Sequence, residues 1–256
     1  MVARSRSLQA RLFPHGWTDV LRQVLLFGAA YFAYRLVRGG VDERAAVAFQ
    51  HARDLINLER GMHIFVEPTV QAWASGSRIV QEAASFIYIN AQTTTMVGAL
   101  LWLYVCRNES YYFVRNMMIV AMAIALIGYI VFPTAPPRML PEWGFVDTVT
   151  DLTGVHTDTV ATSALFNPYA AIPSMHLAMA LMIGWPLARL VRPRSLRVFW
   201  AVYPLVMTFV IVVTANHFLI DGVLGAMTAG VAALAARSLA RARPRAWAFR
   251  TAGAPA

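Results

Sequence analysis

The feature that most constrains this chain is a series of apolar runs, each about as long as a lipid bilayer is thick. A hydrocarbon core about 30 Å across is spanned by roughly 20 mostly apolar residues in a helix. Five runs have this character: residues 79–105, 111–132, 174–191, 196–213 and 217–239. A sixth run, residues 20–37, has Arg22 and Arg35 near its ends, where their aliphatic stems let the charges reach water. The sequence therefore predicts an all-α polytopic membrane protein, a six-transmembrane-helix bundle.

The composition and charge agree with a membrane location. Hydrophobic residues make up 58% of the 256 residues and charged residues 14%, whereas a soluble domain has about 45–50% and about 25%. This composition excludes an ordinary water-soluble enzyme. All 22 basic residues are arginine, and the formal net charge is +9. With a mean hydropathy of +0.53, this charge indicates lipid rather than nucleic acid as the partner. The single cysteine, Cys106, excludes an intramolecular disulfide and any multi-thiolate metal site.

Two of the connections between the apolar runs are long. Residues 41–74 mix charged residues with apolar residues at helical spacing, which predicts interfacial helices between spans one and two. Residues 133–171 are rich in Pro, Thr and Asp without helical periodicity, and loops of this length are usually functional or disordered. We expect a cytoplasmic N-terminal segment over 1–19, a six-helix membrane domain over 20–240, and a basic cytoplasmic tail over 241–256 that contacts anionic headgroups.

The distribution of arginines predicts which way the bundle faces. Fifteen arginines lie in the terminal segments, in the turns at 106–110 and 192–195, or at the adjoining span ends. Six lie on the face that carries the two long connections. Because arginine-rich segments favour the cytoplasm, we expect a multi-pass protein of the cell membrane whose long connections lie outside. This orientation depends on the first run being a full span. The run lacks a small-x-small cleavage site, so we expect it to stay in the protein and not to be removed as a signal peptide.

Three polar segments are predicted to meet on this outer face: residues 132–138, 171–176 and 214–221. Polar groups at the ends of membrane helices are costly, so a cluster of them points to function. His217 and Asp221 are four residues apart, and on a helix the carboxylate can accept a hydrogen bond from one ring nitrogen. The other nitrogen can then act as a nucleophile in phosphoryl transfer through a phosphohistidine. The alternative is a structural role, in which His217 stands at the start of a helix and its hydrogen-bonding need is met by the neighbouring carboxylate.

The other two segments supply residues suited to phosphate. His176 lies at the third position of a helix opening with Pro173-Ser174, where Ser174 and the positive helix end favour an anion. The alternative is a capping serine followed by a histidine in interfacial water. Arg138 has a planar donor fork that matches phosphate oxygens. Its alternative is a salt bridge to one of the acids of the same loop, which are Glu142, Asp147, Asp151 and Asp158.

The same residues allow a metal site as a weaker alternative. His176, His217 and Asp221 form a two-histidine, one-carboxylate set, which is a known ligand group. Asp221, however, is placed more naturally to orient His217 than to bind a metal. The remaining histidines have no matching carboxylate spacing and are assigned no role; they are His15, His51, His63 and His156.

Taken together, the three segments resemble the type 2 phosphatidic acid phosphatase superfamily and, within it, the inositol phosphorylceramide synthase-like branch. The resemblance covers approximately residues 55–236, and its motifs are Pro136-Pro137-Arg138, Pro173-Ser174-Met175-His176, and His217 with Asp221. It implies that the membrane domain is catalytic, with His217 as nucleophile, Asp221 as its orienting acid and His176 as general acid. It also implies that Ser174 and Arg138 bind phosphate, and it implies no divalent metal or other cofactor.

Two departures move the resemblance toward the synthase-like branch. The phosphatase branch has Ser-Arg where this chain has Val210-Ile211, and its first motif begins with a lysine, which this chain lacks. The expected substrate is a lipid phosphate ester in the outer leaflet. Water as acceptor makes the protein a phosphatase, and a lipid or polyol hydroxyl makes it a transferase. The competing class is a transporter or non-catalytic scaffold, but a transporter is expected to show repeat symmetry and ionisable groups at the midplane, and the sequence shows neither.

Overall fold

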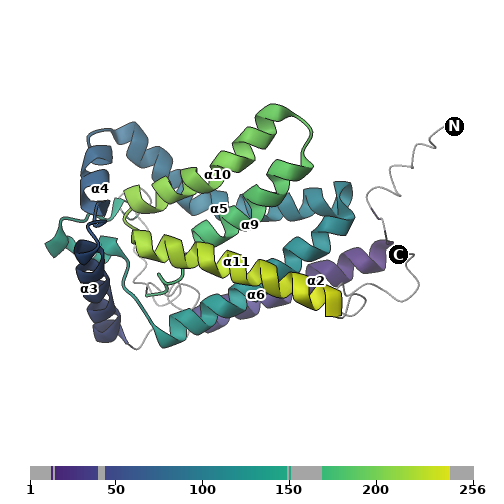
Figure 1. Ribbon diagram of the computed structural model, residues 1–256, viewed down its shortest axis with the longest axis horizontal. Coiled ribbons are helices and arrows are strands. Elements are labelled where there is room, and N and C mark those ends of the chain that lie inside the picture. Colours follow the sequence, from purple (N-terminus) through teal and green to yellow (C-terminus); the bar gives the residue numbers. More distant parts are fainter. Residues whose placement is uncertain (1–12, 14, 40–43, 149, 151–168, 243–256) are drawn as a thin grey trace.

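A computed structural model describes residues 13, 15–39, 44–148, 150 and 169–242 of the chain (Figure 1). Its α-helices are α2 (Trp17–Gly39), α3 (Ala45–Gly61), α4 (Glu67–Ser75), α5 (Arg78–Cys106), α6 (Asn108–Val131), α9 (Met175–Leu190), α10 (Arg194–Val213) and α11 (Leu219–Ala242). Two short 3₁₀ helices, η1 (Pro137–Met139) and η2 (Pro141–Trp143), follow α6. The described residues form no β-strand, and one isolated bridge joins Thr134 to Ala170. The predicted all-α class is confirmed for this part of the chain.

The six predicted spans are not equally supported. Among the described residues, three helices are long and apolar enough to cross a membrane, namely α6, α10 and α11. Helix α9 is apolar but has only 16 residues, which corresponds to roughly 24 Å at 1.5 Å per residue. Helices α2 and α5 form over the predicted first and second runs, but α5 carries polar residues from Asn90 to Thr95 in its middle. The described part of the chain thus supports a membrane protein, while the count of six spans stays a prediction.

The long helices pack around α6 and α9. Helix α9 contacts α5, α6, α10 and α11, and α6 also contacts α2 and α11. Met118 of α6 and Met179 of α9 are completely or almost completely buried in the main core, together with Ala232 of α11. Small residues on α11 allow close approach, because a Cβ on Gly225 would lie only 2.3 Å from the carbonyl oxygen of Ser174. This packing brings the first turns of α9 and α11 together.

Helix α2 is held to the bundle by buried polar groups that the sequence analysis did not identify. The Asp19 carboxylate accepts hydrogen bonds from the hydroxyls of Tyr104 (2.8 Å) and Tyr112 (3.2 Å). Arg115 of α6 is fully buried and donates to the side chain of Gln23. Buried polar groups are costly unless they are paired, so this network fixes the position of α2 against α5 and α6.

The predicted helices between the first two runs are present as α3 and α4, and Figure 1 shows them at the end of the long helices where α11 begins. Helix α3 also contacts the loop that follows α6. The His51 ring stacks on Phe132 at 3.8 Å between centroids, and His51 Nδ1 donates to the carbonyl of Pro133 over 2.8 Å. Of the long connection, residues 151–168 lie outside the described part of the chain.

Candidate active site

The turn between α10 and α11 positions His217. Helix α10 ends at Val213, and Ala215 adopts the left-handed conformation with φ of 49°. The N–H groups of Asn216 and His217 both donate to the carbonyl of Ile211, over 3.1 and 3.3 Å. Since α11 begins at Leu219, His217 lies before the helix and not on its first turn. The last helix thus begins two residues after the start of the predicted run, and the prediction that His217 and Asp221 share one helix was wrong because this reversal intervenes.

The His217–Asp221 contact forms nevertheless, by a different route from the one predicted. Nδ1 of His217 lies 3.3 Å from Oδ2 of Asp221, and the same oxygen accepts the backbone N–H of Phe218 over 3.0 Å. The carboxylate thus holds the turn and the imidazole at once. Asp221 is fully buried and His217 is 5% exposed. The contact is made by Nδ1, so Nε2 lies on the side of the ring away from Asp221.

His176 lies next to this pair. It is the second residue of α9, and its ring centroid is 5.6 Å from that of His217 with a tilt of 60°. The ring of Tyr88, from α5, stacks on His176 with centroids 4.2 Å apart. Tyr88 was missed in the sequence analysis because an aromatic residue inside an apolar run carries no local signal. His176 comes from α9 and His217 from the turn before α11. Two groups that act as acid and base on one substrate must lie close together in this way.

The segment that leads into α9 packs against glycines of two helices, at Pro173 and at Ser174. A Cβ on Gly128 of α6 would lie 2.7 Å from Pro173 Cδ, and one on Gly225 of α11 would lie 2.3 Å from the Ser174 carbonyl oxygen. The Ser174 side chain makes no capping hydrogen bond to α9, so the capping alternative is not what the structure shows. Its Oγ is buried and has no hydrogen-bond partner among the described residues. A buried hydroxyl without a partner costs free energy, which suggests that it serves a ligand.

Arg138 reaches the same turn from η1. Its backbone N–H donates to the carbonyl of Ala215 over 2.7 Å, and its Nη1 donates to Oδ1 of Asn216 over 2.9 Å. Its Nε lies 3.3 Å from Oδ2 of Asp147, and the Arg138 side chain is only 9% exposed. Arg138 therefore lies beside the third motif. It also forms an ion pair with Asp147, which is the alternative role that the sequence allowed. Of the other loop acids, Glu142 pairs with Arg53 at 3.5 Å, and Asp151 and Asp158 lie outside the described residues.

Two acids that the sequence analysis left on the membrane surface hold the start of α11. The Glu59 carboxylate accepts the N–H of Ile220 over 2.9 Å, and the Glu67 carboxylate accepts the N–H of Leu219 over 2.8 Å. Both glutamates are fully buried. Free amides at a helix N-terminus are satisfied by acceptors of this kind. The sequence gives no signal for these contacts, because each joins residues more than 150 positions apart.

The two glutamates cannot both be charged without cost. Burial, followed by the neighbouring Glu67, raises the pKa of Glu59 to about 9. Burial disfavours the charged form, and a like charge nearby disfavours it further. Both causes favour the protonated form of Glu59, one of whose oxygens accepts the N–H of Ile220. Among the described residues, no three His, Cys, Asp or Glu side chains are grouped as ligands for a metal ion.

Comparison with known proteins gives one match. A family model described as the PAP2 superfamily matches residues 53–235, a range that contains all three polar segments and both buried glutamates. No curated protein and no solved structure matches the chain.

Proposed function

Because this chain belongs to the PAP2 superfamily, we propose that it is a membrane phosphatase or phosphotransferase that acts on a lipid phosphate ester through a phosphohistidine on His217. The observation that carries the proposal is the geometry of His217, whose Nδ1 faces the buried Asp221 carboxylate while its ring lies 5.6 Å from that of His176. An imidazole oriented by a carboxylate is an activated nucleophile. A second histidine at this distance is able to exchange a proton with the leaving group.

The reaction proceeds in two steps. In the first, the Nε2 lone pair of His217 attacks phosphorus, and the bond from phosphorus to the alkoxide oxygen breaks as protonated His176 gives that oxygen its proton. In the second, water or an alcohol attacks phosphorus, and the bond from phosphorus to Nε2 breaks. Neutral His176 takes the proton of the attacking hydroxyl, which restores both histidines. Asp221 stabilises the positive charge that develops on His217 during the first step.

The phosphate oxygens need donors that replace the Ser-Arg pair of the phosphatase branch. Val210 and Ile211, at those positions, are buried and apolar. We assign the role to the Ser174 hydroxyl and to Arg138, whose Nη2 makes no hydrogen bond to a described residue. A planar guanidinium is suited to phosphate. Position 211 is Ile and not arginine, and this difference favours the second form of the proposal, in which the protein is an inositol phosphorylceramide synthase-like transferase.

The acceptor and the substrate are open to a direct test. Purified protein in detergent with a chelator is given a panel of lipid phosphates, with and without inositol or a lipid alcohol. We expect turnover of at least one lipid phosphate and trapping of an alkali-stable phosphohistidine from a phosphorus-labelled substrate. Phosphate release identifies a phosphatase, and a new phosphodiester identifies a transferase. Absence of turnover and of label on His217 with every substrate would support a non-catalytic scaffold instead.

A further inference from the structure

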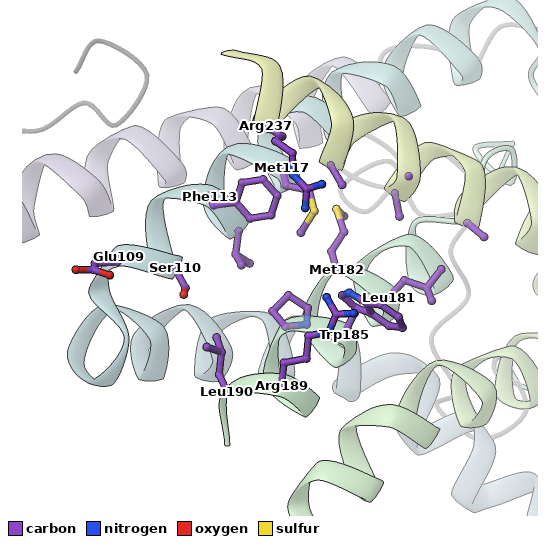
Figure 2. Close-up of a pocket in the computed structure, with 16 residues that line it drawn as sticks. Glu109, Ser110, Phe113, Met117, Leu181, Met182, Trp185, Arg189, Leu190 and Arg237 are labelled. Carbon is purple, nitrogen blue, oxygen red and sulfur yellow. The ribbon is translucent and has the colours of Figure 1, made fainter. Parts of the chain in front are cut away.

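A cavity lies between three of the long helices. It has a volume of about 620 Å³ and is lined by α6, α9 and α11 (Figure 2). Its lining includes Arg189 and Arg237, which are near the C-terminal ends of α9 and α11, whereas His176 and Asp221 are in the first turns of these helices. Arg189 follows His176 by thirteen positions on α9, which corresponds to roughly 20 Å. The two arginines of the cavity are therefore at the opposite end of the bundle from the proposed catalytic site, while its apolar walls begin at Leu181 and Ala226, five residues after His176 and Asp221.

Apart from Arg237, helix α11 contributes only small residues to the cavity. On α11 the lining residues before Arg237 are Ala226, Ala229, Gly230 and Ala233, all on one helical face. A Cβ on Gly230 would meet no atom within 4 Å. The facing walls are apolar and include Phe113 and Met117 of α6 and Met182 of α9, which Figure 2 shows around the opening. The volume is typical of small-molecule sites, which range from about 300 to 1,000 Å³.

Two arginines give one end of this apolar cavity a positive charge. The guanidinium of Arg189 lies over the Trp185 ring, 4.1 Å from its centroid, which limits its orientations. Neither Arg189 nor Arg237 forms an ion pair within the described part of the chain. The one acid of the lining, Glu109, lies at the far edge in Figure 2 with its carboxylate pointing away from both arginines.

We propose that this cavity binds one anionic diacyl phospholipid from the leaflet opposite the catalytic site, with acyl chains on the apolar walls and the phosphate at Arg189 and Arg237. A soluble anion would leave the apolar walls exposed to water, and an uncharged lipid would leave the arginines unused. An anionic phospholipid satisfies both parts of the lining. Arginines at a membrane surface attract such headgroups by roughly fivefold per residue. The inference does not depend on the proposed function.

The experiment uses photo-crosslinking in vesicles. The full-length protein is reconstituted in phosphatidylcholine with a trace of phosphatidylglycerol that carries a diazirine in one acyl chain, and the adducts are mapped to peptides. We expect adducts on the α6 and α9 walls, competed by unlabelled phosphatidylglycerol and much less by phosphatidylcholine. Gly230→Leu should remove these adducts, because its side chain would occupy the cavity from a position where an added Cβ meets no other atom. The matched control Gly98→Leu, whose glycine is equally open but lies on α5, should keep them.

The charge is tested with a second pair of variants. Arg189→Gln with Arg237→Gln should reduce the preference for phosphatidylglycerol by roughly 25-fold, at about fivefold per arginine. The double variant Arg194→Gln with Arg241→Gln removes two charges outside the cavity and should leave the preference unchanged. Ala233→Leu serves in place of Gly230→Leu if the latter does not fold. Equal competition by phosphatidylcholine, competition by soluble glycerophosphoglycerol, or crosslinks between two copies of the chain would each overturn the proposal.

Discussion

The backbone N–H of Ser174 donates a hydrogen bond of 3.0 Å to the backbone carbonyl of Asp221. This bond joins the start of α9 to the first turn of α11, so the second and third motifs are one structural unit. Gly225 makes the approach possible, because any Cβ there would meet the Ser174 carbonyl oxygen. The predictions below follow from this unit and from the residues around it.

Gly225→Ala should damage the site without replacing any side chain of the proposed chemistry. The added methyl would lie 2.3 Å from the Ser174 carbonyl oxygen, so α9 and α11 must separate. Overpacking of this kind costs about 1–3 kcal/mol, and we expect a lower thermal unfolding midpoint together with reduced turnover. Gly98→Ala, at a glycine with open space around it, should be neutral or slightly stabilising. Equal behaviour of the two variants in unfolding and turnover assays would show that the contact is unimportant.

His217→Ala should abolish turnover while the protein still folds, because the covalent route needs the Nε2 nucleophile. Initial rates with the best lipid phosphate, and labelling by a phosphorus-labelled substrate, provide the measurement. His63→Asn is the control, since His63 is exposed and precedes α4. Residual activity above a few per cent in the His217 variant would rule out the phosphohistidine mechanism.

His176→Ala should give a loss that depends on the leaving group. Removal of a general acid costs about 10²–10⁴-fold, and the loss should shrink for substrates whose leaving groups are acidic enough to depart without a proton. The comparison is between kcat values for an alkyl ester and a nitrophenyl ester. An identical loss for both esters would contradict the role and point to a positioning effect through the stacked Tyr88 ring.

Arg138→Lys should lose nearly as much activity as Arg138→Ala if the guanidinium binds phosphate with its planar fork. The ammonium keeps the charge but cannot reproduce the contact to Asn216 and a phosphate together. Arg53→Lys, in the exposed pair with Glu142, is the matched control and should have little effect on kcat/KM. Full activity with reduced stability in both Arg138 variants would mean that Arg138 serves only as the partner of Asp147.

Stability should fall with rising pH because of Glu59. Its pKa is raised from 4.5 to about 9 in the folded protein, so the native state binds a proton that the unfolded state releases. The resulting stabilisation is complete below about pH 4.5 and is lost progressively as pH rises toward 9. Glu59→Gln mimics the protonated acid and should flatten this dependence in thermal unfolding between pH 5 and pH 9. Glu82→Gln, at a partly exposed acid paired with Arg78, should leave the dependence unchanged.

Much of this molecule is predictable from sequence because the signals are local. A run of about 20 apolar residues specifies a membrane helix whatever its neighbours are, and helices form over all six predicted runs. The three polar segments are far apart in sequence, but counting the spans between them places them on one face of the membrane, so their proximity was expected. The boundaries were less certain: His217 lies before α11 because the left-handed Ala215 reverses the chain, and periodicity does not reveal such a turn.

The sequence by itself determined the all-α class and the membrane environment, and it singled out the polar segments that contain His176, His217 and Asp221. Only the tertiary structure decided that Tyr88 stacks on His176, that Glu59 and Glu67 hold the start of α11, and that Arg138 pairs with Asp147 as well as Asn216. The physical reason is that the cost of burying a charge depends on the groups around it. Those groups come from distant parts of the chain and leave no periodic pattern in it.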